Sequence, residues 1–185
     1  MTSLRDRLRA STAFRHERAD RAYSSLDLRR TDGLRTFLRA QLWVLDSIRC
    51  CSGPHAAEAE DLRSRMAQSL RRDLRVLDST PAVVSGQCRL NATAMLYLLL
   101  GSSLGTQILR RRWQEAADPA VAAAGQYLGL CVPQKAWGRL CEELARLGAE
   151  GAEADRIVHD ASRIFDLHLG ALGGFARLAE GALDV

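Results

Sequence analysis

The chain reads ATAMLYLLLGSSLGT at residues 92–106, and this stretch decides the fold we expect. Apolar side chains occupy almost every position from Ala92 to Leu100, so a helix formed here is apolar nearly all round. A helix of that kind is stable when other elements cover it on every side. We therefore predict a central, buried helix over about residues 89–113.

Two glycines, Gly101 and Gly105, stand four positions apart inside this predicted helix. Each costs about 1 kcal/mol relative to alanine in a helix interior. One interpretation is that the bare backbone allows close packing of another helix. The other is that a flat ligand lies against this backbone, with Ser102, Ser103 and Thr106 easing a kink. The sequence leaves both open.

Helical periodicity continues on both sides of this segment. Only four prolines occur, and β-branched residues are scarce beside leucine, alanine and arginine, which favours helices over a sheet. We find no repeat and no linker long enough to divide domains, so residues 1–185 are predicted to form one all-α domain of seven or eight helices. The other predicted helices start after Ser3, at Asp32-Gly33 (ending at residues 52–54), at about residue 55 (to 77), at Asp118-Pro119, at Val132-Pro133 (to about 147) and at about residue 152 (to 178).

Composition excludes several classes of protein. The chain has 47% hydrophobic and 26% charged residues, a globular balance that is not typical of disorder. Its net charge of +4 is carried almost wholly by arginine, since Lys135 is the only lysine. Basic and acidic residues alternate without a basic block, so we expect no nucleic-acid partner.

Cysteine usage and the N-terminus indicate a cytoplasmic protein. The five cysteines form an odd set without a CxxC spacing, which predicts neither a zinc site nor a disulfide framework. Arg5, Asp6 and Arg7 interrupt any apolar signal core. The longest apolar run, residues 94–100, is too short to cross a bilayer. We therefore expect a soluble, reduced protein without a membrane partner.

The first candidate for chemistry is His16. It continues a row of i+4 positions formed by Leu4, Leu8 and Thr12, so we expect its imidazole to point inward. An inward histidine is either a core residue or a ligand. The other three histidines lie in other segments, which disfavours a zinc or di-iron site. Haem brings its own equatorial ligands and needs only one such axial side chain.

A haem would also need partners for its two propionate groups. Arginine forks, lysine and tyrosine hydroxyls suit carboxylates. Arg9 stands two turns before His16, and Tyr97 stands one turn before Gly101. Lys135 and Arg139 on the penultimate predicted helix are further candidates. Each of these four side chains has an ordinary alternative as a solvated or core residue.

These segments resemble the haem oxygenase family. STAFRH at residues 11–16, with Asp20 one turn further, is similar to the segment that supplies the proximal histidine, and Thr12 stands four before the histidine as in that pattern. YLLLGSSLG at residues 97–105 resembles the distal helix of bacterial members, including those that accompany bacteriophytochromes. ASRIF at residues 161–165 is similar to their C-terminal helix.

The resemblance implies a haem held between a proximal N-terminal helix and a kinked distal helix. It implies that His16 is the iron ligand and that Gly101, Ser102 and Gly105 form the catalytic distal face. The cofactor-binding residues would come from the remaining candidates, which are Arg9, Thr12, Tyr97, Lys135 and Arg139.

The activity that the resemblance implies is oxidative cleavage of haem to biliverdin, carbon monoxide and ferrous iron. The reaction uses O₂ and electrons from a reductase or ferredoxin, and a bacteriophytochrome is a candidate acceptor of biliverdin. Ser102 departs from animal members, where an aspartate helps to order water around bound oxygen. Two alternatives follow: a non-catalytic haem-binding or haem-sensing protein on the same scaffold, and a thiaminase-like helical protein with an acidic or cysteine nucleophile.

Overall fold

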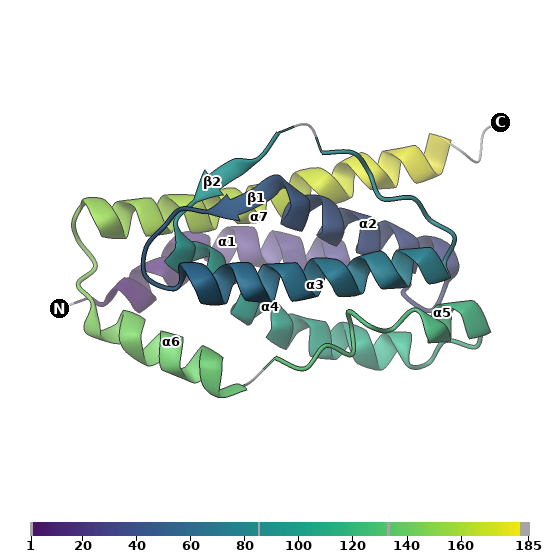
Figure 1. The fold of residues 1–185 in the computed structure, drawn as a ribbon, viewed down its shortest axis with the longest axis horizontal. Coiled ribbons are helices and arrows are strands. Elements are labelled where there is room, and N and C mark those ends of the chain that lie inside the picture. Colours follow the sequence, from purple (N-terminus) through teal and green to yellow (C-terminus); the bar gives the residue numbers. More distant parts are fainter. Residues whose placement is uncertain (1, 85, 133, 182–185) are drawn as a thin grey trace.

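Seven helices and two short strands make up the part of the chain that the computed structural model describes, residues 2–84, 86–132 and 134–181 (Figure 1). The all-α class is therefore confirmed for these residues; Pro133, an expected helix start, lies outside them. The elements are α1 (Leu4–Ser24), α2 (Thr31–Ser47), β1 (Ile48–Cys50), α3 (Ala56–Val76), β2 (Cys88–Leu90), α4 (Ala92–Trp113), α5 (Pro119–Ala123), α6 (Gln134–Arg146) and α7 (Ala152–Gly181).

Short polar side chains fix where several helices begin. Ser3 caps α1 by accepting the N–H of Asp6 at 3.2 Å, as the sequence predicts. Asp118 caps α5 in the same way, and Asn91 caps α4. Each cap satisfies a backbone donor that the first turn of a helix leaves unpaired.

The longest helix, α7, organises the packing. It lies against α1, α2 and α4, while α3 packs on α2 and α4. Ion pairs join the outer edges of α1 and α7: Arg7 with Asp155 at 2.6 Å, and Arg15 with Asp166 at 2.9 Å. The helix that carries His16 is therefore held mainly by a helix from the far end of the chain.

The first half of α4 is buried as predicted. Residues 92–100 are buried apart from the half-buried Tyr97, whereas Leu104 and Ile108 in the second half are exposed. Among the described residues, α4 is also the one helix long and apolar enough to cross a bilayer, although the apolar run within it is short; buried core helices share that property.

The helix is continuous across Gly101 and Gly105. The hydroxyls of Ser102, Ser103 and Thr106 donate to carbonyls three residues earlier, at 3.0, 2.6 and 2.7 Å. Such bonds are associated with bending of helices. The kink itself stays a prediction.

Two helix boundaries differ from the prediction, for one reason. The second helix ends at Ser47 and not at residues 52–54, and the central helix begins at Ala92 and not near residue 89. Residues 48–50 instead pair in parallel with residues 88–90, and Cys51 N–H donates to Leu90 O at 2.7 Å. This pairing joins segments forty residues apart, so local periodicity does not reveal it.

Candidate functional site

A cleft of about 390 Å³ opens between α1, α4 and α7, and its volume falls in the range of small-molecule sites. Residues from six segments of the chain line it, and most of its surface is apolar. The lining residues are His16, Ala19, Asp20, Tyr23, Phe37, Gln41, Tyr97, Leu98, Gly101, Ser102, Leu104, Gly105, Thr106, Leu109, Tyr127, Trp137, Phe165 and His168.

His16 lies on the α1 wall of this cleft. Its Nδ1 is 2.9 Å from Oδ2 of Asp20, and its ring meets the Phe165 ring edge-on at a centroid distance of 5.6 Å. The carboxylate favours a proton on Nδ1, which leaves the lone pair on Nε2. Asp20 thus supplies the partner for the second ring nitrogen that the sequence did not identify.

The expected inward direction of His16 is wrong in part. Its side chain is 58% exposed, whereas Leu4, Leu8 and Thr12 are buried. A row of i+4 positions rotates by about 40° at each step, because the helix has 3.6 residues per turn. After three steps the row has left the core-facing side and reached the edge of the cleft.

Thr12 does not line the cleft. Its side chain is buried, and its hydroxyl donates to Leu8 O at 2.8 Å within α1. The predicted cofactor contact of Thr12 therefore has no support in the geometry. The residue has an intrahelical role instead.

Gly101, Ser102 and Gly105 all line the α4 wall. A Cβ atom added at Gly105 would meet no atom within 4 Å, and one added at Gly101 would meet the Trp137 ring at 3.5 Å, an ordinary contact. Helix packing therefore requires neither glycine. The absent side chain of Gly105 leaves open space on the cleft side, which favours the ligand interpretation over the packing one at this position.

Of the four candidate propionate partners, only Tyr97 is among the described residues that line the cleft. Tyr97 lines the cleft, and its ring lies against Trp137 at a centroid distance of 5.2 Å. Burial raises the pKa of Tyr97, and the charges of Arg5 and Arg9 oppose that rise. Arg9 is exposed and does not line the cleft.

Lys135 and Arg139 are not brought to the cleft. Lys135 is exposed and absent from the lining. Arg139 pairs with Glu58 on α3 at 2.9 Å. Both lie on α6, whose buried face presents Trp137 to the cleft in their place. The prediction that either residue holds a propionate has no support in this arrangement.

His168 is a cleft residue that sequence reasoning missed. It comes from α7, and its Nδ1 lies 3.3 Å from the Tyr23 hydroxyl. Burial lowers the pKa of His168 to about 4, so the ring is neutral near pH 7. It follows Ile164 and Phe165 at helical spacing on one apolar face of α7, which was the available signal.

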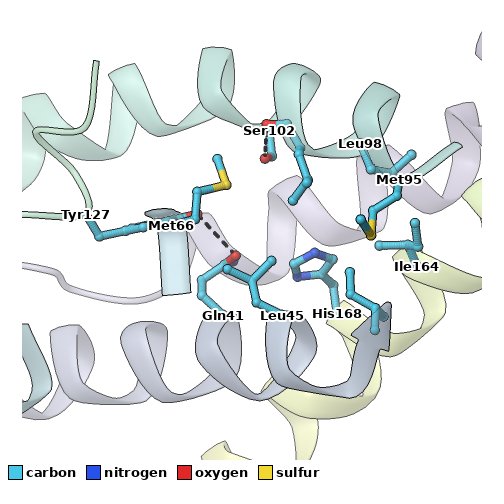
Figure 2. A pocket seen from close by; sticks show the side chains of 11 residues that line it. Gln41, Leu45, Met66, Met95, Leu98, Ser102, Tyr127, Ile164 and His168 are labelled. Atoms are coloured by element: carbon cyan, nitrogen blue, oxygen red, sulfur yellow. Dashed lines mark hydrogen bonds between the residues drawn. The ribbon is translucent and has the colours of Figure 1, made fainter. Parts of the chain in front are cut away.

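A second, water-sized cavity of about 10 Å³ adjoins the cleft (Figure 2). It shares Gln41, Tyr127, Ser102 and His168 with the cleft, and Met66 and Met95 line it from α3 and α4. The inner end of the cleft therefore carries polar groups, although most of its walls are apolar.

The described part of the cleft offers few side chains that could act as metal ligands or nucleophiles. Within the described residues, no three or more His, Cys, Asp or Glu side chains gather as a metal site. The described lining holds no cysteine, and its one acidic residue, Asp20, is engaged with His16. The thiaminase-like alternative therefore lacks the cysteine nucleophile that it expects in the cavity.

No family model matches this chain, and a comparison with curated proteins finds no match either. Functional inference therefore depends on two things: the geometry of the cleft, and the resemblance in residues 11–16 and 97–105.

Proposed function

We propose that the chain binds haem in the cleft between α1 and α4 and oxidises it to biliverdin, carbon monoxide and ferrous iron. One observation carries the proposal: an imidazole with an available Nε2 stands on one wall, and open glycine backbone stands on another wall of the same cleft. A flat macrocycle with one protein ligand would find an axial nitrogen on the first wall and open space on the second.

The residues present fit this group. The empty space at Gly105, which a side chain would occupy, gives a planar ligand access to the backbone of α4. Phe37, Leu98 and Leu109 supply apolar surface that excludes water from the cleft. When bound, haem supplies the iron that activates O₂ and is also the ring that is opened.

On the α1 wall, His16 would hold the iron through Nε2. Asp20 beside Nδ1 would keep the imidazole in one orientation. A neutral imidazole does not push electron density toward O–O cleavage as a thiolate does, which agrees with attack on the ring itself.

On the α4 wall, one turn before Gly101, a propionate would meet the Tyr97 hydroxyl. Burial raises the pKa of Tyr97, and the charges of Arg5 and Arg9 oppose this rise; the same two charges would favour a carboxylate here. A carboxylate bound at this position gains charge-assisted interactions without a buried, unpaired charge.

A second candidate is a haem-binding protein without turnover, and Ser102 favours it. Its hydroxyl donates to Leu99 O at 3.0 Å, within α4. The described lining of the cleft contains no carboxylate from α4. The group that orders water around oxygen in animal members of the resembled family therefore has no counterpart on this wall.

A hemin titration followed by reduction tests both candidates. We expect a histidine-type Soret band in the wild-type protein and in His159→Ala, an exposed α7 histidine outside the lining, and its loss in His16→Ala. Bilin absorbance after reductant and O₂ supports the oxygenase. A Soret band without bilin supports the second candidate, and no Soret band in the wild type refutes both.

A further inference from the structure

A buried carboxylate that lies outside the cleft forms hydrogen bonds to a loop, and this loop forms part of the cleft wall. Asp73 on α3 has an exposed fraction of 0%, and no cation pairs with it among the described residues. Its two oxygens accept the backbone N–H groups of Gln126 and Tyr127, each at 2.8 Å. Burial raises the pKa of Asp73, and these two bonds oppose the rise. All described hydrogen bonds of the Asp73 carboxylate therefore go to the backbone of a single loop.

That loop, residues 124–130, is fitted tightly against α4. The Trp113 indole N–H donates at 2.7 Å to the O atom of Val121 in α5, just before the loop. A Cβ atom at Gly125 would lie 2.3 Å from the Trp113 ring, so this position accepts only glycine without a shift. Trp113 and Asp73 thus hold the loop from two different helices.

The loop places Tyr127 at the inner end of the cleft. The Tyr127 ring lies 6.0 Å from the Phe37 ring, and its hydroxyl donates to Gln41 Oε1 at 3.4 Å (Figure 2). Tyr127 is 4% exposed and lines both the cleft and the small inner cavity. Its side chain is therefore part of the boundary between the two spaces.

We propose that Asp73 is a positioning residue that sets the depth of the cleft by holding Tyr127 as its inner wall. That the ligand is haem rests on the proposed function. That Asp73 positions Tyr127 does not. Fixing the backbone at residues 126 and 127 fixes the root of the Tyr127 side chain. The depth that a planar ligand reaches is then decided by a residue that does not touch it.

Replacing Asp73 by asparagine tests its hydrogen bonds to the loop while the volume of the side chain stays nearly the same. Asp73→Asn keeps the shape but leaves one acceptor oxygen, so its amide NH₂ would face one of the two N–H groups. The remaining bond also loses its charge assistance. The matched control is Leu70→Ala: Leu70 is fully buried one turn earlier on α3 and lines neither cavity. This substitution leaves a cavity and lowers stability, and it removes no hydrogen bond to the loop.

Fluorine NMR reports on the environment of the Tyr127 ring directly, because the chain has only three tyrosines and their signals can be told apart. In protein labelled with 3-fluorotyrosine, Tyr→Phe variants assign the signals of Tyr23, Tyr97 and Tyr127. We expect Asp73→Asn to shift the Tyr127 signal and leave that of Tyr97 in place. Leu70→Ala should lower the melting temperature and leave both signals in place. With hemin bound, the Soret maximum should move in Asp73→Asn and not in Leu70→Ala.

Three results would overturn the proposal. They are an unchanged Tyr127 signal in Asp73→Asn, an equal shift in Leu70→Ala, and a Soret maximum that Asp73→Asn leaves in place. If Asp73→Asn does not fold, amide exchange in the wild type decides: the N–H groups of residues 126 and 127 must exchange more slowly than those of an exposed loop. Failure of the wild type to bind hemin refutes the proposed function, while the fluorine comparison without hemin still tests the wall.

Discussion

Replacing Gly105 by leucine should stabilise the protein while it blocks the cleft. Glycine costs about 1 kcal/mol relative to alanine in a helix interior, and leucine is close to alanine. A Cβ atom at Gly105 meets nothing within 4 Å, so no clash offsets this gain. We expect the free energy of unfolding to rise by about 0.5–1 kcal/mol, and the melting temperature by about 2 °C for a chain of this length.

The same leucine should oppose hemin binding. Its side chain extends into space that the ligand is proposed to occupy, and forcing extra carbon atoms into a filled site costs about 1–3 kcal/mol. That corresponds to a rise of about 5- to 150-fold in the hemin Kd. Bilin yield should fall with occupancy.

Gly138→Leu is the matched control, since Gly138 lies in α6, meets nothing within 4 Å of an added Cβ and does not line the cleft. Thermal melts and hemin titrations on both variants separate the explanations. Hemin binding as tight in Gly105→Leu as in the wild type would refute the ligand role of this glycine. A drop in stability for Gly105→Leu alone would support helix packing instead.

Further predictions concern the polar groups of the cleft. Asp20→Asn should weaken hemin binding about 10- to 100-fold and shift the Soret maximum, because the carboxylate beside His16 is lost; titration at one pH measures this. Tyr97→Phe should change the hemin Kd or the biliverdin isomer ratio more than Arg9→Ala does, because Tyr97 lines the cleft and Arg9 is exposed; unaltered values in both variants would place the propionates elsewhere. His168 is neutral in the folded state, with a pKa near 4 against 6.5 when unfolded, so its contribution to stability is complete above pH 6.5 and is lost as the pH falls toward 4. The loss should approach about 3 kcal/mol, and denaturant melts of the wild type and His168→Gln should converge across that window.

Local patterns predicted what local interactions decide. The cap at Ser3 and the Asp118-Pro119 start depend on neighbours within one turn, and both are present. The burial of residues 92–100, Tyr97 apart, follows from their apolar composition. The parallel pairing of residues 48–50 with 88–90 depends on a distant partner and was missed.

The candidate site divides along the same line. Gly101 and Gly105 were singled out because glycine is unfavourable inside a helix, and His16 because it continues the i+4 row of its own helix. His168 and Tyr127 reach the cleft only through packing of α7 and a loop, so no spacing relates them to His16. Arg139 was misplaced because Glu58, far away in sequence, draws it to α3.

The pairing of α1 with α7 has a consequence for synthesis of the protein. Arg7 and Asp155 are 148 residues apart, and Arg15 and Asp166 are 151 apart. A ribosome adding about 5–20 residues per second needs roughly 7–30 s to cover that distance. Throughout this interval α1 has emerged without its main partner. The wall that carries His16 is therefore completed last, so we expect any ligand of the cleft to bind only after α7 has been made.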